Sequence, residues 1–105
     1  MEQKRAIYVF VRNDLSYSQK VVQSCHAVLE STRKFVTDDK RYKIVVLAAK
    51  SEVKLKSIMD EATTHGIQTV GFTEPDMDFQ MTAVATEPLE EDKRHVFSRF
   101  KLLDE

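Results

Sequence analysis

Continuous apolar runs alternate along the sequence with segments in which apolar residues recur at helical spacing. Residues 6–11 form an unbroken run of apolar and aromatic side chains, and residues 43–49 contain a second largely apolar run. Such runs are typical of strands that are buried on both faces. Residues 67–72 predict a third strand, and residues 81–86 alternate polar with apolar side chains and predict a fourth.

The first helix is predicted between the first two strands, over Ser18–Phe35, with Ser16 or Ser18 as its N-cap. Its apolar residues follow helical spacing and are expected to face the sheet. They are Val21, Val22, Cys25, Val28, Leu29 and Phe35 or Val36. Cys25 is accordingly interpreted as a small core residue.

Two further helices complete the pattern. The second follows Ser51 as N-cap and ends at Gly66, which suits a left-handed C-cap. The third starts at the acidic residues 90–92 and has an apolar face made of Val96, Phe97 and Phe100. Residues 100–103 are expected to return as an extended tail.

The predicted order of elements is β-α-β-α-β-β-α, in one domain spanning residues 1–105. Strands that alternate with helices imply parallel crossovers and a sheet that is covered on both faces. The short link between the last two strands allows an antiparallel neighbour. We therefore expect a three-layer α/β/α fold with a mixed four-stranded sheet.

Composition narrows the functional classes. The single cysteine excludes an internal disulfide framework and a four-cysteine zinc site, and it fits a reducing compartment. No apolar run approaches the roughly 20 residues that span a bilayer, and no secretory signal is visible at the N-terminus. We therefore expect a cytoplasmic protein with no membrane association.

Charge is unevenly distributed, although the formal net charge is only −1. Residues 1–56 hold 12 Lys and Arg against 6 Asp and Glu, whereas residues 57–105 hold 4 against 11. This distribution allows a basic face that could bind phosphates, and it is equally consistent with a chance arrangement of surface charges.

Polar side chains cluster where ligands gather in α/β sheets, at the carboxyl ends of the strands. Arg12 and Asp14 follow the first strand, and Tyr17 lies in the loop before the first helix. Lys20, Gln23 and His26 are spaced one turn apart, so they form one stripe beside that edge. Each of these residues could instead have a structural role. Arg12 and Asp14 could form an ion pair, and Gln23 could be an amide that is hydrogen-bonded at the edge of the core.

An acidic segment separates the third and fourth strands. Glu74, Asp76 and Asp78 alternate as divalent-metal ligands can, but the calcium-loop glycine and distal glutamate are missing. Glycine-rich phosphate loops and zinc motifs are also missing from the sequence. We therefore expect no metal and no cofactor.

Two segments resemble a known family. Residues 8–15 read YVFVRNDL and residues 23–27 read QSCHA. Together they resemble the opening of the peptidyl-tRNA hydrolase type 2 family, in which Val-Arg-x-Asp-Leu precedes a helix with Ala-Gln-x-x-His-Ala. Residues 74–76, 82–85 and 100–102 are similar to later parts of that family. Its short phage-type and domain-containing relatives, which have a trimmed loop before the helix, look closer than its archaeal and eukaryotic enzymes.

The chain also departs from that family at three places. The family carries a lysine four residues before the glutamine, where this chain has Gln19, and Lys20 is only three residues before Gln23. The family's loop aspartate is replaced by Glu74. Its first loop threonine has no clear match, whereas its later threonine is matched by Thr82.

The resemblance implies an enzyme that hydrolyses the ester between a peptide and the 3′ ribose of tRNA, without a metal or redox cofactor. The catalytic residues it implies are Lys20, Gln23, Glu74 and Asp14. The substrate-binding residues it implies are Arg12, His26 and Thr82. Tyr17 lies in the loop beside the predicted site, where it could bind substrate by stacking on a base or ribose, or could only cover the start of the helix.

Three points remain open at this stage. A catalytically inactive RNA- or protein-binding module on the same scaffold is the alternative function. Metal-assisted small-molecule chemistry at the acidic segment is a more distant one. A homodimer could form through an edge strand or through a Phe97–Phe100 face.

Overall fold

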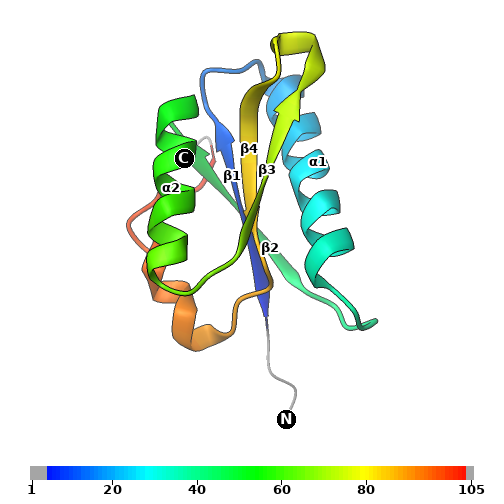
Figure 1. Ribbon diagram of the computed structural model, residues 1–105, viewed down its shortest axis with the longest axis vertical. Helices are drawn as coiled ribbons and strands as arrows, with labels where there is room; N and C mark the ends of the chain where they lie inside the picture. Colours follow the sequence, from blue (N-terminus) through cyan, green and yellow to red (C-terminus); the bar gives the residue numbers. More distant parts are fainter. Residues whose placement is uncertain (1–4, 104–105) are drawn as a thin grey trace.

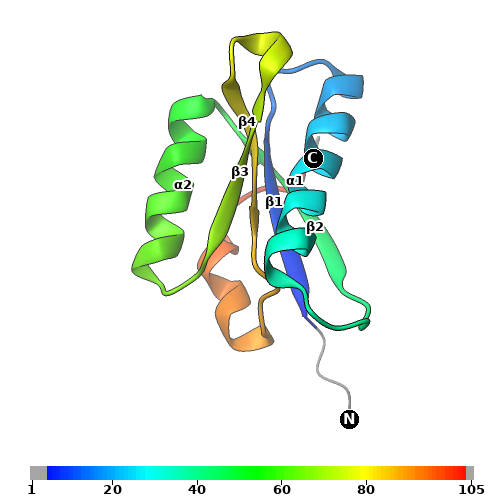
Figure 2. The same ribbon diagram turned by 45° about the vertical axis from the view of Figure 1, so that its right-hand side comes forward.

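The computed structural model describes residues 5–103, which form a twisted sheet between two layers of helix (Figures 1 and 2). The elements follow in the order β1 (Ala6–Arg12), α1 (Tyr17–Phe35), β2 (Lys43–Ala49), α2 (Glu52–Thr64), β3 (Thr69–Glu74), η1 (Pro75–Met77), β4 (Gln80–Thr86) and η2 (Glu91–Phe97). The elements η1 and η2 are short 3-10 helices. This order confirms the predicted one, with η2 as the third helix.

The sheet is mixed, as expected. Its strand order is β2-β1-β4-β3. Strand β1 pairs in parallel with β2, whereas β4 is antiparallel to both β1 and β3. The three parallel strands therefore end at the same edge of the sheet. Helix α1 covers one face, and α2 with η2 covers the other (Figures 1 and 2).

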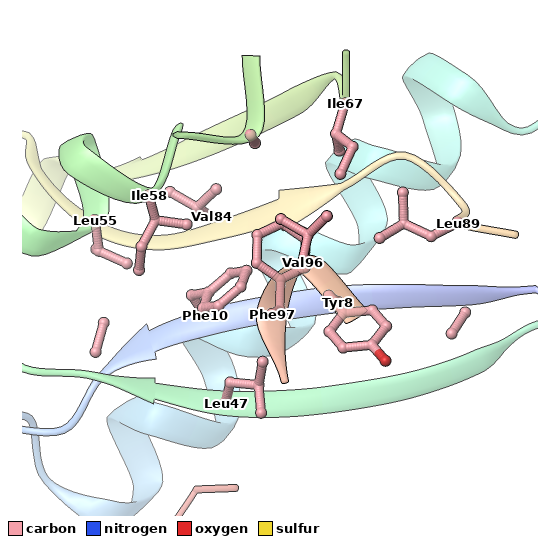
Figure 3. Close-up of a cluster of buried hydrophobic side chains, with 13 residues drawn as sticks. Tyr8, Phe10, Leu47, Leu55, Ile58, Ile67, Val84, Leu89, Val96 and Phe97 are labelled. Carbon is pink, nitrogen blue, oxygen red and sulfur yellow. The ribbon is translucent and has the colours of Figure 1, made fainter. Parts of the chain in front are cut away.

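The larger core lies between the sheet and the layer formed by α2 and η2 (Figure 3). Phe97 of η2 packs edge-on against Phe10 at a centroid separation of 5.0 Å. Leu55 and Ile58 of α2 fill the same space. Phe97 is only 2% exposed, so it belongs to the interior and does not offer a surface for a second chain.

The C-terminal tail returns along the outer strand β2, as predicted. Leu102 forms an antiparallel bridge with Leu47. The backbone N–H of Ala48 donates to the carbonyl of Lys101 at 3.0 Å, and the N–H of Leu103 donates to the carbonyl of Val46 at 3.0 Å. These bonds occupy part of an otherwise open strand edge.

The orientation of α1 differs from the sequence prediction. The apolar residues Val21, Val22, Cys25 and Leu29 are exposed, and Leu29 is 58% exposed. The buried residues of this helix are Gln23, Ser24, Ala27 and Ser31. The prediction was therefore wrong for these four residues, including the interpretation of Cys25 as a core residue, whereas Val28 and Val36 pack against the core as predicted.

Close packing of α1 on the sheet explains this inversion. Ala27 faces a surface made partly of Ala83 and Ala85, which lie in the same buried cluster. The hydroxyl of Ser31 donates to the backbone carbonyl of Thr86 at 2.7 Å. Small side chains on both surfaces let helix and sheet approach closely, and larger apolar side chains would not fit there.

Several boundaries also shift. Helix α1 begins at Tyr17 with Ser16 as N-cap, and Ser16 and Gln19 form a reciprocal capping box. Strand β3 begins at Thr69 instead of Ile67 and continues to Glu74, so Glu74 is the last residue of a strand. Gly66 has a φ of 73°, which fits the predicted left-handed end of α2. Within residues 5–103, none of the helices has the length and hydropathy that a membrane span requires.

The observed orientation of α1 predicts that substitutions at Ala27 and Leu29 change the free energy of unfolding by different amounts. Ala27→Leu should lower the free energy of unfolding by about 1–3 kcal/mol, because the added carbons overpack the contact with the sheet. Leu29→Gln should change it by less than about 0.5 kcal/mol in dilute, monomeric protein, because this side chain lies at the surface of the single chain. Urea denaturation measures both, and a larger loss for Leu29→Gln would contradict the helix orientation.

Candidate functional site

Three polar side chains from three elements are joined by hydrogen bonds between α1 and the sheet. The hydroxyl of Thr82 on β4 donates to Oε1 of Gln23 on α1 at 2.6 Å. Nε2 of Gln23 then donates to Oε2 of Glu74, at the end of β3, at 3.1 Å. Thr82 is fully buried and Gln23 is 4% exposed. We call this arrangement the Thr82–Gln23–Glu74 chain.

A β-bulge directs Thr82 toward α1. In the pairing of β3 with β4, Phe72 is opposite Ala83 but Thr73 is opposite Met81, which leaves Thr82 as an extra residue. Met81 packs against the core on the α2 side, whereas Ala83 lies in the cluster on the α1 side. Residues two apart in a regular strand share a face, so the bulge reverses the alternation and brings Thr82 under α1.

Strand β3 positions Glu74 by ordinary alternation. Val70 and Phe72 pack against the α1-side cluster, and Glu74 follows with the same period of two. Its second carboxylate oxygen, Oε1, accepts from the backbone N–H of Asp76 at 3.4 Å. Glu74 is partly exposed, so it joins the buried amide of Gln23 to the surface.

His26 lies one turn beyond Gln23, as the predicted stripe requires. Its ring stacks on Phe72 with a centroid separation of 4.5 Å and an interplanar angle of 5°. Phe72 precedes Glu74 by two residues on the same face of β3. His26 therefore borders the Thr82–Gln23–Glu74 chain from the exposed side of α1.

The first turn of α1 carries the other predicted helix residues. Lys20 is half-buried and lies one turn before Gln23. Tyr17 is 73% exposed. Gln19, four residues before Gln23, accepts from the backbone N–H of Ser16 through its amide oxygen at 3.2 Å. Its side chain is thereby tied to the start of the helix.

Arg12 and Asp14 form a separate group at the end of β1. Nε and Nη2 of Arg12 donate to the two carboxylate oxygens of Asp14 at 3.0 and 2.9 Å. Nη1 also donates to Oε1 of Gln80 at 2.8 Å. The guanidinium hydrogen bond lowers the pKa of Asp14, and the same bond raises the pKa of Arg12.

The two groups adjoin through two residues of β4 that are separated only by Met81. Gln80 contacts Arg12, and Thr82 begins the hydrogen-bonded chain to Gln23 and Glu74. The structure thus joins Gln23, Glu74 and Thr82 directly. It pairs Asp14 with Arg12, which is the structural alternative that the sequence left open.

Sequence analysis missed one exposed aromatic residue near Glu74. Phe79 is 68% exposed and lies in the turn between η1 and β4. Its polar neighbours Asp78 and Gln80, outside the predicted strands, were the available signal. Across residues 5–103, no three His, Cys, Asp or Glu side chains form a group that could hold a metal ion.

The fold and this polar chain define a small α/β protein with a site at the edge of a mixed sheet. The family described as peptidyl-tRNA hydrolase PTH2 matches residues 6–103, nearly the whole chain. The protein therefore belongs to the peptidyl-tRNA hydrolase PTH2 family, which confirms the resemblance seen in the sequence.

A solved structure shares the fold. It is a protein of unknown function, Atu0240, from Agrobacterium tumefaciens strain C58, with 19% sequence identity and a TM-score of 0.61. The match covers 96% of this chain and 98% of that protein. At this identity the likeness shows the fold alone. No curated protein matches the chain.

The Arg12–Asp14 pair predicts a dependence of stability on pH. Because the pKa of Asp14 is lowered in the folded protein, its stabilising contribution is complete above the ordinary aspartate pKa of about 3.9. The contribution is lost as the pH falls through the lowered folded-state pKa. NMR titration of the Asp14 carboxyl should give a higher pKa in Arg12→Met than in the wild type. Arg33→Met is the control, and an equal rise there would contradict the assignment.

Proposed function

We propose that the protein hydrolyses the ester that joins a peptide to the 3′ ribose of tRNA. The observation that carries this proposal is the Thr82–Gln23–Glu74 chain, which fixes a carboxylate at the carboxyl end of β3. Membership of the peptidyl-tRNA hydrolase PTH2 family supports the same substrate. The reaction needs a water molecule, a group that takes its proton and a donor for the developing oxyanion.

Glu74 is the better choice for activating water. It accepts hydrogen bonds from the Gln23 amide and from the N–H of Asp76, which orient it, and it is partly exposed. Both carboxylate oxygens of Asp14 already accept from Arg12. In the proposed step, Glu74 takes a proton from water as the water oxygen bonds to the ester carbonyl carbon. The bond between the carbonyl carbon and the ribose oxygen then breaks, and the ribose oxygen takes up the proton that Glu74 received, which leaves the free peptide and the deacylated tRNA.

Lys20 and Gln23 are the proposed oxyanion donors. Lys20 lies one turn before Gln23 on α1 and carries a positive charge. The Gln23 amide has two N–H donors, of which one points to Glu74. Either group would stabilise the negative charge on the carbonyl oxygen while the water attacks.

Thr82 has a positioning role in this proposal. Because its hydroxyl donates to Oε1 of Gln23, the NH₂ group of that amide turns toward Glu74. The reversed amide would place two oxygen acceptors together at Glu74. Thr82 therefore acts on substrate through Gln23 and Glu74.

Basic residues of the N-terminal half are the proposed tRNA contacts. Arg12 and Asp14 brace the neighbouring turn, while Tyr17 and His26 border the site from α1. The positive side chains proposed to contact phosphates are Lys40, Arg41, Lys43, Lys50, Lys54 and Lys56. Binding should weaken steeply with salt, because phosphate neutralisation releases counterions. This substrate implies action in the cytoplasm, where tRNA is used in translation.

Glu74→Gln tests the catalytic assignment. The substitution keeps the size of the side chain but removes the base, so kcat should fall about 10²- to 10⁴-fold on a defined peptidyl-tRNA. Asp76→Asn is the matched control, since it removes a nearby exposed carboxylate, and its rate should stay within about threefold. Equal rates for both variants and the wild type would exclude Glu74 as the base.

A binding module without catalysis is the second candidate function. The observation that favours it is Gln19, which stands four residues before Gln23 and serves the helix cap. Tight, salt-sensitive binding of tRNA with no hydrolysis by the wild type would favour this function over the enzyme.

We also propose a homodimer through the exposed face of α1. Its apolar side chains are placed about symmetrically around Cys25: the exposed Val21 and Val22 precede it, and the half-buried Val28, which also packs against the sheet, and the exposed Leu29 follow it. Two such helices packed antiparallel across Cys25 would bring Val21 against Val28 and Val22 against Leu29 of the second copy. The face is therefore complementary to itself.

The single cysteine allows a direct test of this dimer. A short bis-maleimide should link two wild-type chains through Cys25 at low micromolar concentration. Leu29→Lys should reduce the linked fraction at least fivefold, because it places like charges at the contact. Thr63→Lys on α2 is the control. Equal linking of both variants would show that the α1 faces meet only by random collision.

A further inference from the structure

The turn that follows η1 contains an unusual backbone. Asp78 has a φ of 54° and Phe79 a φ of 58°, and they are the only residues other than glycine with positive φ among residues 5–103. Gly, Asn and Asp are the residues that favour this left-handed conformation. A bulky Phe is an outlier in this region, since its Cβ is crowded by the backbone.

The ring of Phe79 is also poorly buried. It is 68% exposed, although apolar side chains are normally stabilised by removal from water. The backbone conformation therefore costs folding free energy, and burial of the ring offsets little of that cost. A sequence that needed only the turn would be better served by glycine, which adopts a positive φ without crowding of a Cβ atom. Strained residues of this kind cluster at functional sites.

Hydrogen bonds on either side of the Phe79 side chain tie its backbone to Glu74 and to the Arg12 group. Its backbone N–H donates to the carbonyl of Glu74 at 2.9 Å. The next residue, Gln80, accepts from Arg12, which is held by Asp14. The turn is thus closed on Glu74 and braced by the Arg12 group. The backbone of Phe79 is thereby held next to that of Glu74, and its exposed ring starts from the residue that closes this turn.

The chemistry of the substrate indicates what the ring contacts. The ester and the terminal base are attached to the same ribose, so a substrate reacting at Glu74 places that base close by. The 3′ end of tRNA is single-stranded, and aromatic side chains recognise such bases by stacking on them. We infer that Phe79 is a stacking contact for the 3′-terminal base of tRNA, an inference that rests on the proposed function.

Phe79→Gly is the decisive variant, because its effects on folding and on binding should have opposite signs. The urea midpoint should rise or stay unchanged, since glycine accepts the positive φ. The KM for peptidyl-tRNA should rise roughly 5- to 100-fold, the range expected for loss of one stacked base. Phe79→Trp should keep the wild-type KM. Val53→Ala, which removes another exposed apolar side chain, should change neither quantity.

Binding of deacylated tRNA tests the same contact without catalysis. The wild type should lose affinity when the 3′-terminal nucleotide is removed from the tRNA. Phe79→Gly should bind the intact and the shortened tRNA equally. If the two proteins show this difference in affinity but the wild type does not hydrolyse peptidyl-tRNA, the stacking contact is supported and the proposed catalysis is rejected.

Three results would overturn the inference. The first is hydrolysis by the wild type with an unchanged KM in Phe79→Gly, which would leave the proposed function standing. The second is an equal loss of affinity in both proteins on removing the nucleotide. The third is a KM effect that depends on the peptide and not on the base, which would place the ring against the peptide.

Discussion

The buried amide of Gln23 is the constraint on which the site depends. An amide that is 4% exposed must find partners for its oxygen and its nitrogen, or it would destabilise the fold. Thr82 supplies the donor for the oxygen, and Glu74 accepts from the nitrogen. Satisfying the interior therefore also fixes the orientation of a carboxylate at the surface, so stability and the proposed chemistry rely on the same two bonds.

That arrangement requires α1 to lie close to the sheet. Small residues such as Ala27 and Ser31 face the strands, and Ser31 donates to the backbone of β4. A helix with large side chains on this surface would stand farther from the sheet, and Gln23 would no longer reach Thr82. Val21, Val22 and Leu29 of α1 consequently lie on the outer surface, where a second copy of the chain is the partner that we propose.

The β3–β4 connection combines two departures from regular structure within a few residues. The bulge at Thr82 turns a hydroxyl toward α1, and the left-handed turn at Asp78 and Phe79 exposes an aromatic ring. Glu74 lies between them in space, because it bonds to Gln23 and to the backbone of Phe79. Both features reduce local regularity, and both involve residues that are linked to Glu74, one through the Gln23 amide and the other through the backbone. Bulges and strained residues are common beside functional sites for this reason.

The sequence by itself determined the elements, their order and the mixed sheet, because apolar runs and helical spacing are local signals. It also supplied Gln23, Glu74 and Thr82 through the family resemblance. Tertiary structure decided which face of α1 is buried, so the prediction from Val22 and Leu29 was wrong. Helical spacing shows that one face is apolar, but the separation of helix and sheet selects the side chains that fit between them. The register of β4 against β3 likewise decided where Thr82 points. A bulge arises from the pairing of two strands, so the alternation of polar and apolar residues within either strand does not reveal it.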